Sequence, residues 1–244
     1  MRKAKRNHLK VAQTMNKIFS KKTFSVLLAA AALLSISGIK IQAQQGQPRF
    51  LVTWKSSSYV PPIYSRKALP GPNSSVTASF ELVQNGKLVS LTGKTIYWYL
   101  NDDLLPAGTG KQSVGFLAPA NVPASINLRI QIADLSLTEA VTIPAVAPQV
   151  VIIAPFPNGQ FSDASIKIKS ELYFFNIKNP LQLNYAWTVN GKAPQGAENP
   201  AELSVNINPD AQSGSGLNIG LVVQNPQDTR ETATSRNLNL TFVK

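Results

Sequence analysis

Two tryptophan-centred segments, 89 positions apart, constrain the fold of this chain more than any other feature. Ile96–Asn101 reads Ile-Tyr-Trp-Tyr-Leu-Asn, and Tyr185–Asn190 reads Tyr-Ala-Trp-Thr-Val-Asn. In each segment the tryptophan, Trp98 or Trp187, lies in an alternating run that ends in an asparagine three positions later. Side chains two positions apart share one face of a β-strand, so we expect both tryptophans to point into a core.

The rest of the chain after Gln44 repeats this all-β pattern. Val76–Val83 corresponds to Ser165–Leu172 at the same offset. Short alternating apolar runs are separated by turn residues, including Asn-Gly pairs at 85–86, 158–159 and 190–191 that tolerate positive φ. The predicted strands are Arg49–Trp54, Ser75–Gln84, Lys87–Leu91, Lys94–Asn101, Gln112–Leu117, Ser125–Ala133, Leu137–Ile143, Gln149–Ala154, Ala164–Phe174, Gln182–Asn190, Ala201–Ile207, Gly216–Gln224 and Arg236–Val243.

These residues resemble a known architecture. Trp98 and Trp187, with Asn101 and Asn190 after them, are similar to the strand-centre positions of bacterial immunoglobulin-like or PKD-like repeat domains of the cell surface. The resemblance implies β-sandwiches in which each tryptophan is a core residue, and an extracellular location. It implies no activity, because one fold serves many functions. The disulfide of antibody domains is absent, since the chain has no cysteine.

The predicted organisation has three parts. Residues 1–43 are a signal peptide or membrane anchor, 48–144 are one immunoglobulin-like β-sandwich, and 148–244 are a second one in tandem. The junction is expected at Pro144–Gln149, where two prolines make a short, stiff linker.

The first 43 residues have the composition of an export leader. Eight lysines and arginines and no acid lie in residues 1–22, and the apolar run Phe24–Ser37 follows. Ile41-Gln42-Ala43 fits a cleavage pattern that would cut before Gln44. The 17 residues between Lys22 and Lys40 are also at the lower limit for spanning a bilayer, so an uncleaved anchor is the alternative. The location is therefore predicted to be extracytoplasmic, secreted or membrane-anchored facing outward.

The leader also accounts for the basic charge of the chain. The sequence holds 24 Lys+Arg and 12 Asp+Glu, and nine of the cations but none of the acids precede Gln44. The remainder has 15 cations against 12 acids, a net charge of +3. No basic cluster remains there, so we predict no nucleic-acid partner.

The segment Trp54–Asn73 differs from the strands around it. It holds four prolines, two tyrosines and three cations but no acid, and its length predicts a long loop between the first two strands. Trp54, Tyr59, Tyr64 and Arg66 are candidate partner contacts, because aromatic and arginine side chains are enriched at interfaces. Alternatively, the loop packs its own tyrosines over the end of the sandwich.

Residues that usually carry out chemistry are scarce. The one histidine, His8, lies in the leader, and without cysteine there is no basis for a Ser-His-acid triad, a thiol nucleophile or a zinc site. Asp102 and Asp103 are expected to form a turn. Together with Asp163 they lie near loop ends, but no calcium-loop pattern is present. We predict no enzymatic activity, no catalytic residue, no cofactor and no metal.

A structural or adhesive protein-interaction role at the cell surface or envelope fits this composition best, with other envelope or surface proteins as partners. The alternative is a small-ligand or glycan-binding module, in which Trp54, Tyr59 and Tyr64 form a stacking platform. If the leader is not cleaved, its helix would also contact the membrane.

Overall fold

The computed structural model describes residues 46–194 and 200–244. The predicted leader, residues 1–43, lies outside this range. Pro48–Lys244 form one compact unit. Within the described residues, no helix combines the length and the hydropathy that a membrane crossing requires.

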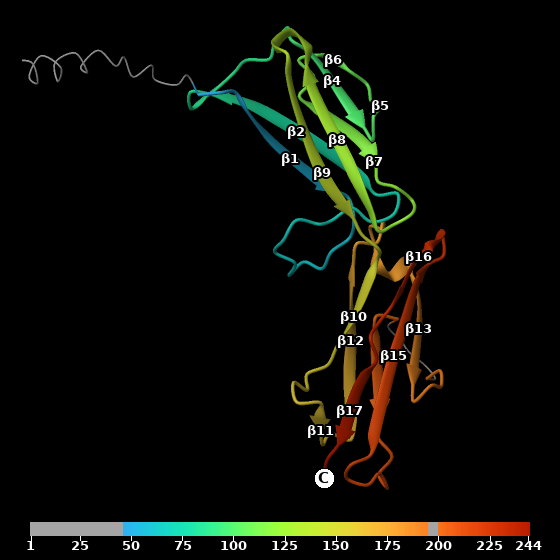
Figure 1. The fold of residues 1–244 in the computed structure, drawn as a ribbon. Helices are drawn as coiled ribbons and strands as arrows, with labels where there is room; N and C mark the ends of the chain where they lie inside the picture. Colours follow the sequence, from blue (N-terminus) through green and yellow to red (C-terminus); the bar gives the residue numbers. More distant parts are fainter. Residues whose placement is uncertain (1–45, 195–199) are drawn as a thin grey trace, which may run out of the picture. The chain divides into compact units, whose positions relative to one another are not determined.

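The all-β prediction is confirmed, and the strands up to Ala145 form two sheets (Figure 1). The first sheet contains β1 (Arg49–Ser56), β2 (Ser75–Gln84), β3 (Lys87–Leu88) and β7 (Ser113–Leu117). The second contains β4 (Thr95–Leu100), β5 (Asp103–Leu104), β6 (Gly108–Thr109), β8 (Ala124–Ile132) and β9 (Leu137–Ala145). A single turn of 3-10 helix, Ala133–Leu135, follows β8.

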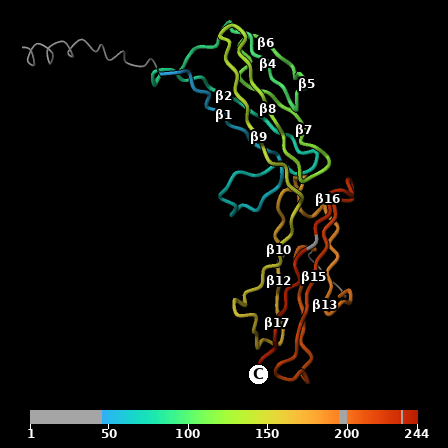
Figure 2. Tube along the Cα trace, viewed as in Figure 1, coloured from blue at the N-terminus to red at the C-terminus, as the bar shows by residue number. Residues whose placement is uncertain are grey.

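The chain passes from β9 into the third sheet, as Figure 2 shows. The third sheet contains β10 (Gln149–Ile153), β12 (Ser165–Tyr173) and β14 (Glu202–Asn206). The fourth contains β11 (Gln160–Phe161), β13 (Asn184–Val189), β15 (Gly216–Asn225), β16 (Asp228–Thr234) and β17 (Leu238–Phe242). A second 3-10 turn, Pro180–Gln182, precedes β13.

Each pair of sheets encloses its own hydrophobic cluster. Within the described range, one cluster surrounds Trp98 and includes Phe80 and Ile130, and the other surrounds Trp187 and includes Ile168 and Ile219. The inward side chains alternate along β2, β8 and β12 with outward polar ones, as the two-residue period of a strand requires.

The two halves share their strand order. The sheet β1-β2-β7 corresponds to β10-β12-β14, and β4-β8-β9 corresponds to β13-β15 with β16 and β17. The asparagine turns match too. Asn101 (φ 47°) and Asn190 (φ 50°) are both left-handed, and their side-chain oxygens accept from the backbone N–H of Asn127 and Asn218 at 3.0 and 2.8 Å.

Several predicted strand boundaries were wrong. The first strand continues past Trp54 to Ser56, the predicted strand 87–91 is only two residues long, and the last strand begins at Leu238 instead of Arg236. The strand β16 was missed because its sequence, Asp-Thr-Arg-Glu-Thr-Ala-Thr, has almost no apolar alternation. It is held by its pairing with β15, which the local sequence does not reveal.

Candidate functional site

The predicted contact residue Trp54 is half-buried against the first hydrophobic cluster. It lies on β1 opposite Ala78 of β2. The Nζ atom of Lys67 lies 4.3 Å from the centroid of its ring, within the range of a cation–π interaction. One face of the indole is therefore already covered by the Lys67 side chain.

The two predicted tyrosines contact the other half of the protein. Tyr59 packs against the second hydrophobic cluster, and its backbone N–H and carbonyl bond to Phe175 and Phe174, both at 2.7 Å. The ring of Tyr64 makes edge contacts with Tyr173 and Phe174, with centroids 5.8 and 6.0 Å apart. Tyr59 therefore packs against the second cluster and Tyr64 against Tyr173 and Phe174, whereas Trp54 packs against the first cluster.

The fourth predicted contact, Arg66, is exposed, and within the described part of the chain it makes no ion pair. It lies in the middle of the segment 57–74, which connects β1 to β2. Of the four candidates, Arg66 alone is exposed, whereas Trp54, Tyr59 and Tyr64 are partly buried.

The segment 57–74 is anchored along its length. Ser58 and Ser74 are buried, and the Ser58 hydroxyl accepts a 2.7 Å hydrogen bond from the Gly71 N–H. Gly71 closely approaches the Phe174 backbone, since a Cβ there would lie 1.8 Å from the Phe174 carbonyl oxygen. The Asn73 side chain donates to the Asp228 carboxylate at 2.9 Å. The loop 57–74, which joins β1 to β2 along the chain, therefore also contacts the second half through Gly71 and Asn73.

A buried carboxylate lies near this connection. Glu231 on β16 is 1% exposed and accepts hydrogen bonds from the Asn176 N–H at 2.8 Å and the Asn225 side chain at 2.6 Å. Burial raises the pKa of Glu231, and these two hydrogen bonds oppose the rise. Asp228, three positions earlier, behaves in the opposite way. A hydrogen bond from Arg230 lowers its pKa, and burial offsets part of the effect.

A polar hollow of about 620 Å³ lies beside the same carboxylate. Asn176, Lys178, Gln182, Asn225 and Gln227 line it, together with one apolar residue, Ile177. The Asn176 N–H and the Asn225 side chain bond Glu231, and the Asn176 side chain donates to the Asn73 carbonyl at 3.1 Å, so this hollow belongs to the polar network between the loop 57–74 and the second half.

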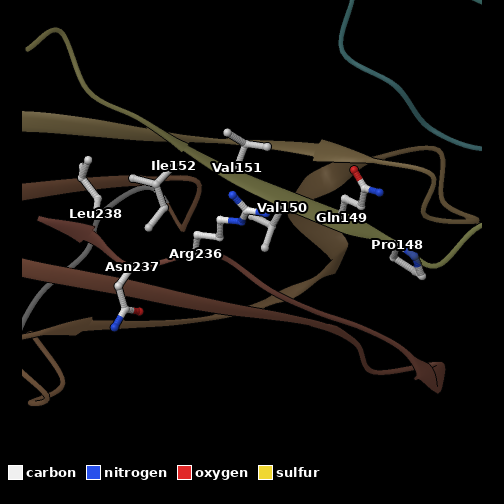
Figure 3. Close-up of a pocket in the computed structure, with 8 residues that line it drawn as sticks. All are labelled: Pro148, Gln149, Val150, Val151, Ile152, Arg236, Asn237 and Leu238. Atoms are coloured by element: carbon white, nitrogen blue, oxygen red, sulfur yellow. The ribbon is translucent and has the colours of Figure 1, made fainter. Parts of the chain in front are cut away.

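A second depression, defined here as the β10 groove, has a volume of about 500 Å³. It lies between β10 and the residues that separate β16 from β17. Figure 3 shows Val150 and Ile152 pointing from β10 toward the side where Arg236 and Leu238 lie, while Val151 points the other way. The lining residues are Pro148, Gln149, Val150, Val151, Ile152, Arg236, Asn237 and Leu238.

The groove lies where β16 has ended and β17 has not yet begun. Residues 235–237, between the end of β16 at Thr234 and the start of β17 at Leu238, do not belong to a strand, and this part of the chain borders the groove. After β10 the chain crosses to the fourth sheet, where β11 pairs in parallel with β17. As a result, β10 pairs with β12 on one side and, within residues 46–194 and 200–244, with no strand on the other.

The β10 edge has neither charge nor proline. Native edge strands usually carry charged side chains that discourage pairing with other chains. The edge strands β1, β9 and β14 follow this rule with Arg49 and Lys55, Glu139, and Glu202 respectively. β10 reads Gln-Val-Val-Ile-Ile and exposes Val151 and Ile153 at 41% and 42%. β7 and β13 are edge strands without charge as well: β13 exposes Asn184 and Ala186, and β7 exposes one large apolar side chain, Leu117, at 62%.

Arg236 is the one ionisable residue among the eight that line the groove. Its side chain is exposed and, within the described residues, has no carboxylate partner, whereas Arg129 and Arg230 are paired with Asp102 and Asp228. The groove therefore combines an apolar wall from Val150, Ile152 and Leu238 with an unpaired guanidinium group.

The acids considered for calcium are not gathered. Asp102 pairs with Arg129 at 3.4 Å in the turn after β4, and Asp103 begins β5. In the described ranges, no three acid or histidine side chains come together as metal ligands would.

Sequence reasoning missed the groove residues. Gln149–Ile153 and Arg236 were placed in predicted strands, but their position on opposite sides of an open edge depends on sheet pairing. The one local signal is the uncharged run after Pro148, which is unusual for a strand that ends a sheet.

No family model matches the chain, and no curated protein matches it. Among solved structures it is similar to the fibronectin(III)-like modules of Clostridium thermocellum CbhA, with 16% identity over 80% of this chain and 94% of that one, at a TM-score of 0.26. It is also similar to the three N-terminal domains of the bacteriophage RB49 highly immunogenic outer capsid protein, with 8% identity over 80% and 59%, at 0.38. A C-terminal intimin fragment gives 9% identity over 75% and 64%, at 0.27. At TM-scores below 0.5, these likenesses assign no function.

Proposed function

We propose that this chain is an exported envelope or surface protein whose role is structural or adhesive, and that it works by binding another protein. In this proposal two tandem immunoglobulin-like β-sandwiches, residues 48–144 and 148–244, follow a leader at residues 1–43. The chain then lies outside the cytoplasm, either released after Ala43 or held by an uncleaved anchor.

The observation that supports a protein partner is the β10 groove. An uncharged edge strand with exposed Val151 and Ile153 is a surface that proteins normally cover or protect. The unpaired Arg236 beside it adds a specific polar contact, and arginine is enriched among residues that dominate binding energies.

A catalytic role is not part of the proposal. The eight residues that line the β10 groove include no carboxylate, hydroxyl or histidine that could act as an acid, a base or a nucleophile. The glycan alternative needs Trp54, Tyr59 and Tyr64 on one surface. Trp54 packs against the first cluster, whereas Tyr59 and Tyr64 contact residues of the second half, and this separation does not favour it.

Site-specific photo-crosslinking in cells that produce the protein tests this proposal. A photoreactive side chain replaces Val151, beside the groove, and a matched variant carries it at Leu88 of β3, which is 66% exposed and belongs to a different sheet. We expect a covalent adduct with another protein from position 151 and a much weaker one from position 88. Equal adducts, or none from either position, would contradict a protein-binding role for this surface.

A further inference from the structure

We infer that the β10 groove binds an extended segment of a partner protein that carries alternating aliphatic side chains and one carboxylate. The segment adds to the free edge of β10 as a new strand, and its carboxylate pairs with Arg236. This inference rests on the proposed protein-binding role and specifies its mode and the chemistry of the partner.

The backbone of β10 supplies the first contact. In an antiparallel pair, every second residue directs its N–H and C=O toward the neighbouring strand, and the residues between direct theirs the other way. β10 uses one set on β12, from Gln149 opposite Tyr173 to Ile153 opposite Lys169. Within the described residues the other set has no strand partner. Strand addition to such an edge is an established mode of peptide recognition.

The groove supplies the second contact. An added strand has the same two-residue period as β10, so alternate side chains would face Val150, Ile152 and Leu238. Val150 is buried and Ile152 and Leu238 are partly buried, so an aliphatic side chain placed there would lose water against an apolar wall. Five residues of β10 at ~3.3 Å each match a partner segment of similar length.

Arg236 supplies the third contact and decides the charge of the partner. A guanidinium without a partner beside an apolar wall favours a carboxylate, which it can bind through two parallel hydrogen bonds. A second copy of this chain that paired its own β10 here would bring Gln149–Ile153, which contains no acid. The charge of the groove therefore points to a different protein with an Asp or Glu in the added strand.

Fluorescence polarisation with synthetic peptides tests the inference on the full chain. The probe is a short labelled peptide in which threonine alternates with two valines and one glutamate, and the matched peptide has lysine in place of glutamate. We expect the glutamate peptide to bind at least about tenfold tighter, which corresponds to one charge-assisted pair. A glutamate peptide with N-methyl groups on the amides that face β10 should not bind.

Variants of the chain make the test specific. Arg236→Glu should reverse the preference, so that the lysine peptide binds better than the glutamate peptide. Arg66→Glu, the control at another exposed arginine, should leave the preference unchanged. Binding that ignores the peptide charge, or that survives N-methylation, would overturn strand addition with a carboxylate.

Two further outcomes separate this inference from the proposed function. If Val151 crosslinks to a protein in cells but neither peptide binds, the interaction role stands and the strand mode is wrong. If the chain forms dimers in solution that Val151→Lys abolishes, and no peptide binds, the occupant is a second copy and the inference of a different partner is overturned.

Discussion

The indole N–H of Trp98 donates a 2.9 Å hydrogen bond to the carbonyl oxygen of Lys111, 13 positions further along the chain. Trp187 makes the same bond, also at 2.9 Å, with the carbonyl of Pro200, again 13 positions on. Both rings lie in hydrophobic clusters, at 0% and 5% exposure. A buried N–H needs an acceptor, and the two halves meet this need with the same contact.

Replacing these rings should therefore be costly. We expect Trp98→Ala and Trp187→Ala each to lower the free energy of unfolding by about 3–5 kcal/mol, as other large core truncations do. Trp98→Phe keeps a large ring but removes the donor to Lys111, so its cost should be smaller, about 1 kcal/mol for the hydrogen bond plus repacking. Urea denaturation measures these values. A loss below about 1 kcal/mol for Trp98→Ala would contradict its core role.

Gly71→Ala should destabilise the protein, because the new Cβ would lie 1.8 Å from the Phe174 carbonyl oxygen. That oxygen is backbone and cannot rotate away, so the loop 57–74 must shift. We expect a loss of more than about 1 kcal/mol and a lower thermal midpoint. Gly216→Ala is the matched control, since nothing lies within 4 Å of its Cβ position. Equal midpoints for the two variants would mean that this close approach does not form.

Glu231 should make stability depend on pH. Burial raises its folded pKa above the ordinary value of 4.5, so the folded state holds the proton more tightly than the unfolded state. The Glu231 contribution is then most favourable below pH 4.5 and decreases as pH rises through the folded pKa. We expect Glu231→Gln, which is always neutral, to gain stability relative to wild type across this window. Urea denaturation at a series of pH values measures the difference.

Asp228 is the internal control for that titration. Its folded pKa lies below the ordinary 3.8, so its contribution is present above that value and is lost as pH falls through the folded pKa. The difference in the free energy of unfolding between Asp228→Asn and wild type should therefore change with pH at acid pH alone. If the difference in the free energy of unfolding between Glu231→Gln and wild type did not change from pH 4.5 upward, burial would not raise the pKa of Glu231.

Tyr64→Ala should reduce stability, because the ring makes edge contacts with Tyr173 and Phe174. Each such pair contributes about 0.5–1.5 kcal/mol beyond its buried area, so we expect a loss of at least about 1 kcal/mol in thermal or urea unfolding. Arg66→Ala, in the same loop but exposed, should change stability by less than about 0.5 kcal/mol. If Tyr64→Ala left stability unchanged, the ring would be available to a ligand.

Most of the fold could be predicted from local pattern. Alternation around Ile166 and Ile168 and the positive-φ asparagine turns at Asn85 and Asn190 are written in short stretches of chain, and the strands and turns form there. β16 could not be found this way, because its polar sequence is a strand only through its pairing with β15.

The candidate site was much less accessible. Tyr59 and Tyr64 lie in the unusual loop as predicted, whereas Trp54 belongs to β1; the neighbours of the two tyrosines, such as Phe174, are more than a hundred positions away. Arg236 has no local sequence signal, and the uncharged run around Val150 does not reveal what faces it, because a groove exists only once separate strands are placed together. Loop composition indicates that side chains have a partner without indicating which one.

The backbone bonds of Tyr59 have one further consequence. Tyr59 exchanges hydrogen bonds with Phe174 and Phe175 of the second half, and the Pro70 carbonyl accepts one from the Val146 N–H at the junction, so the loop of the first half pairs with backbone groups of the second half and of the junction. If either half unfolds, backbone N–H and C=O groups of the other half lose their hydrogen-bond partners. The two halves should therefore unfold in a single cooperative transition, with equal calorimetric and van't Hoff enthalpies.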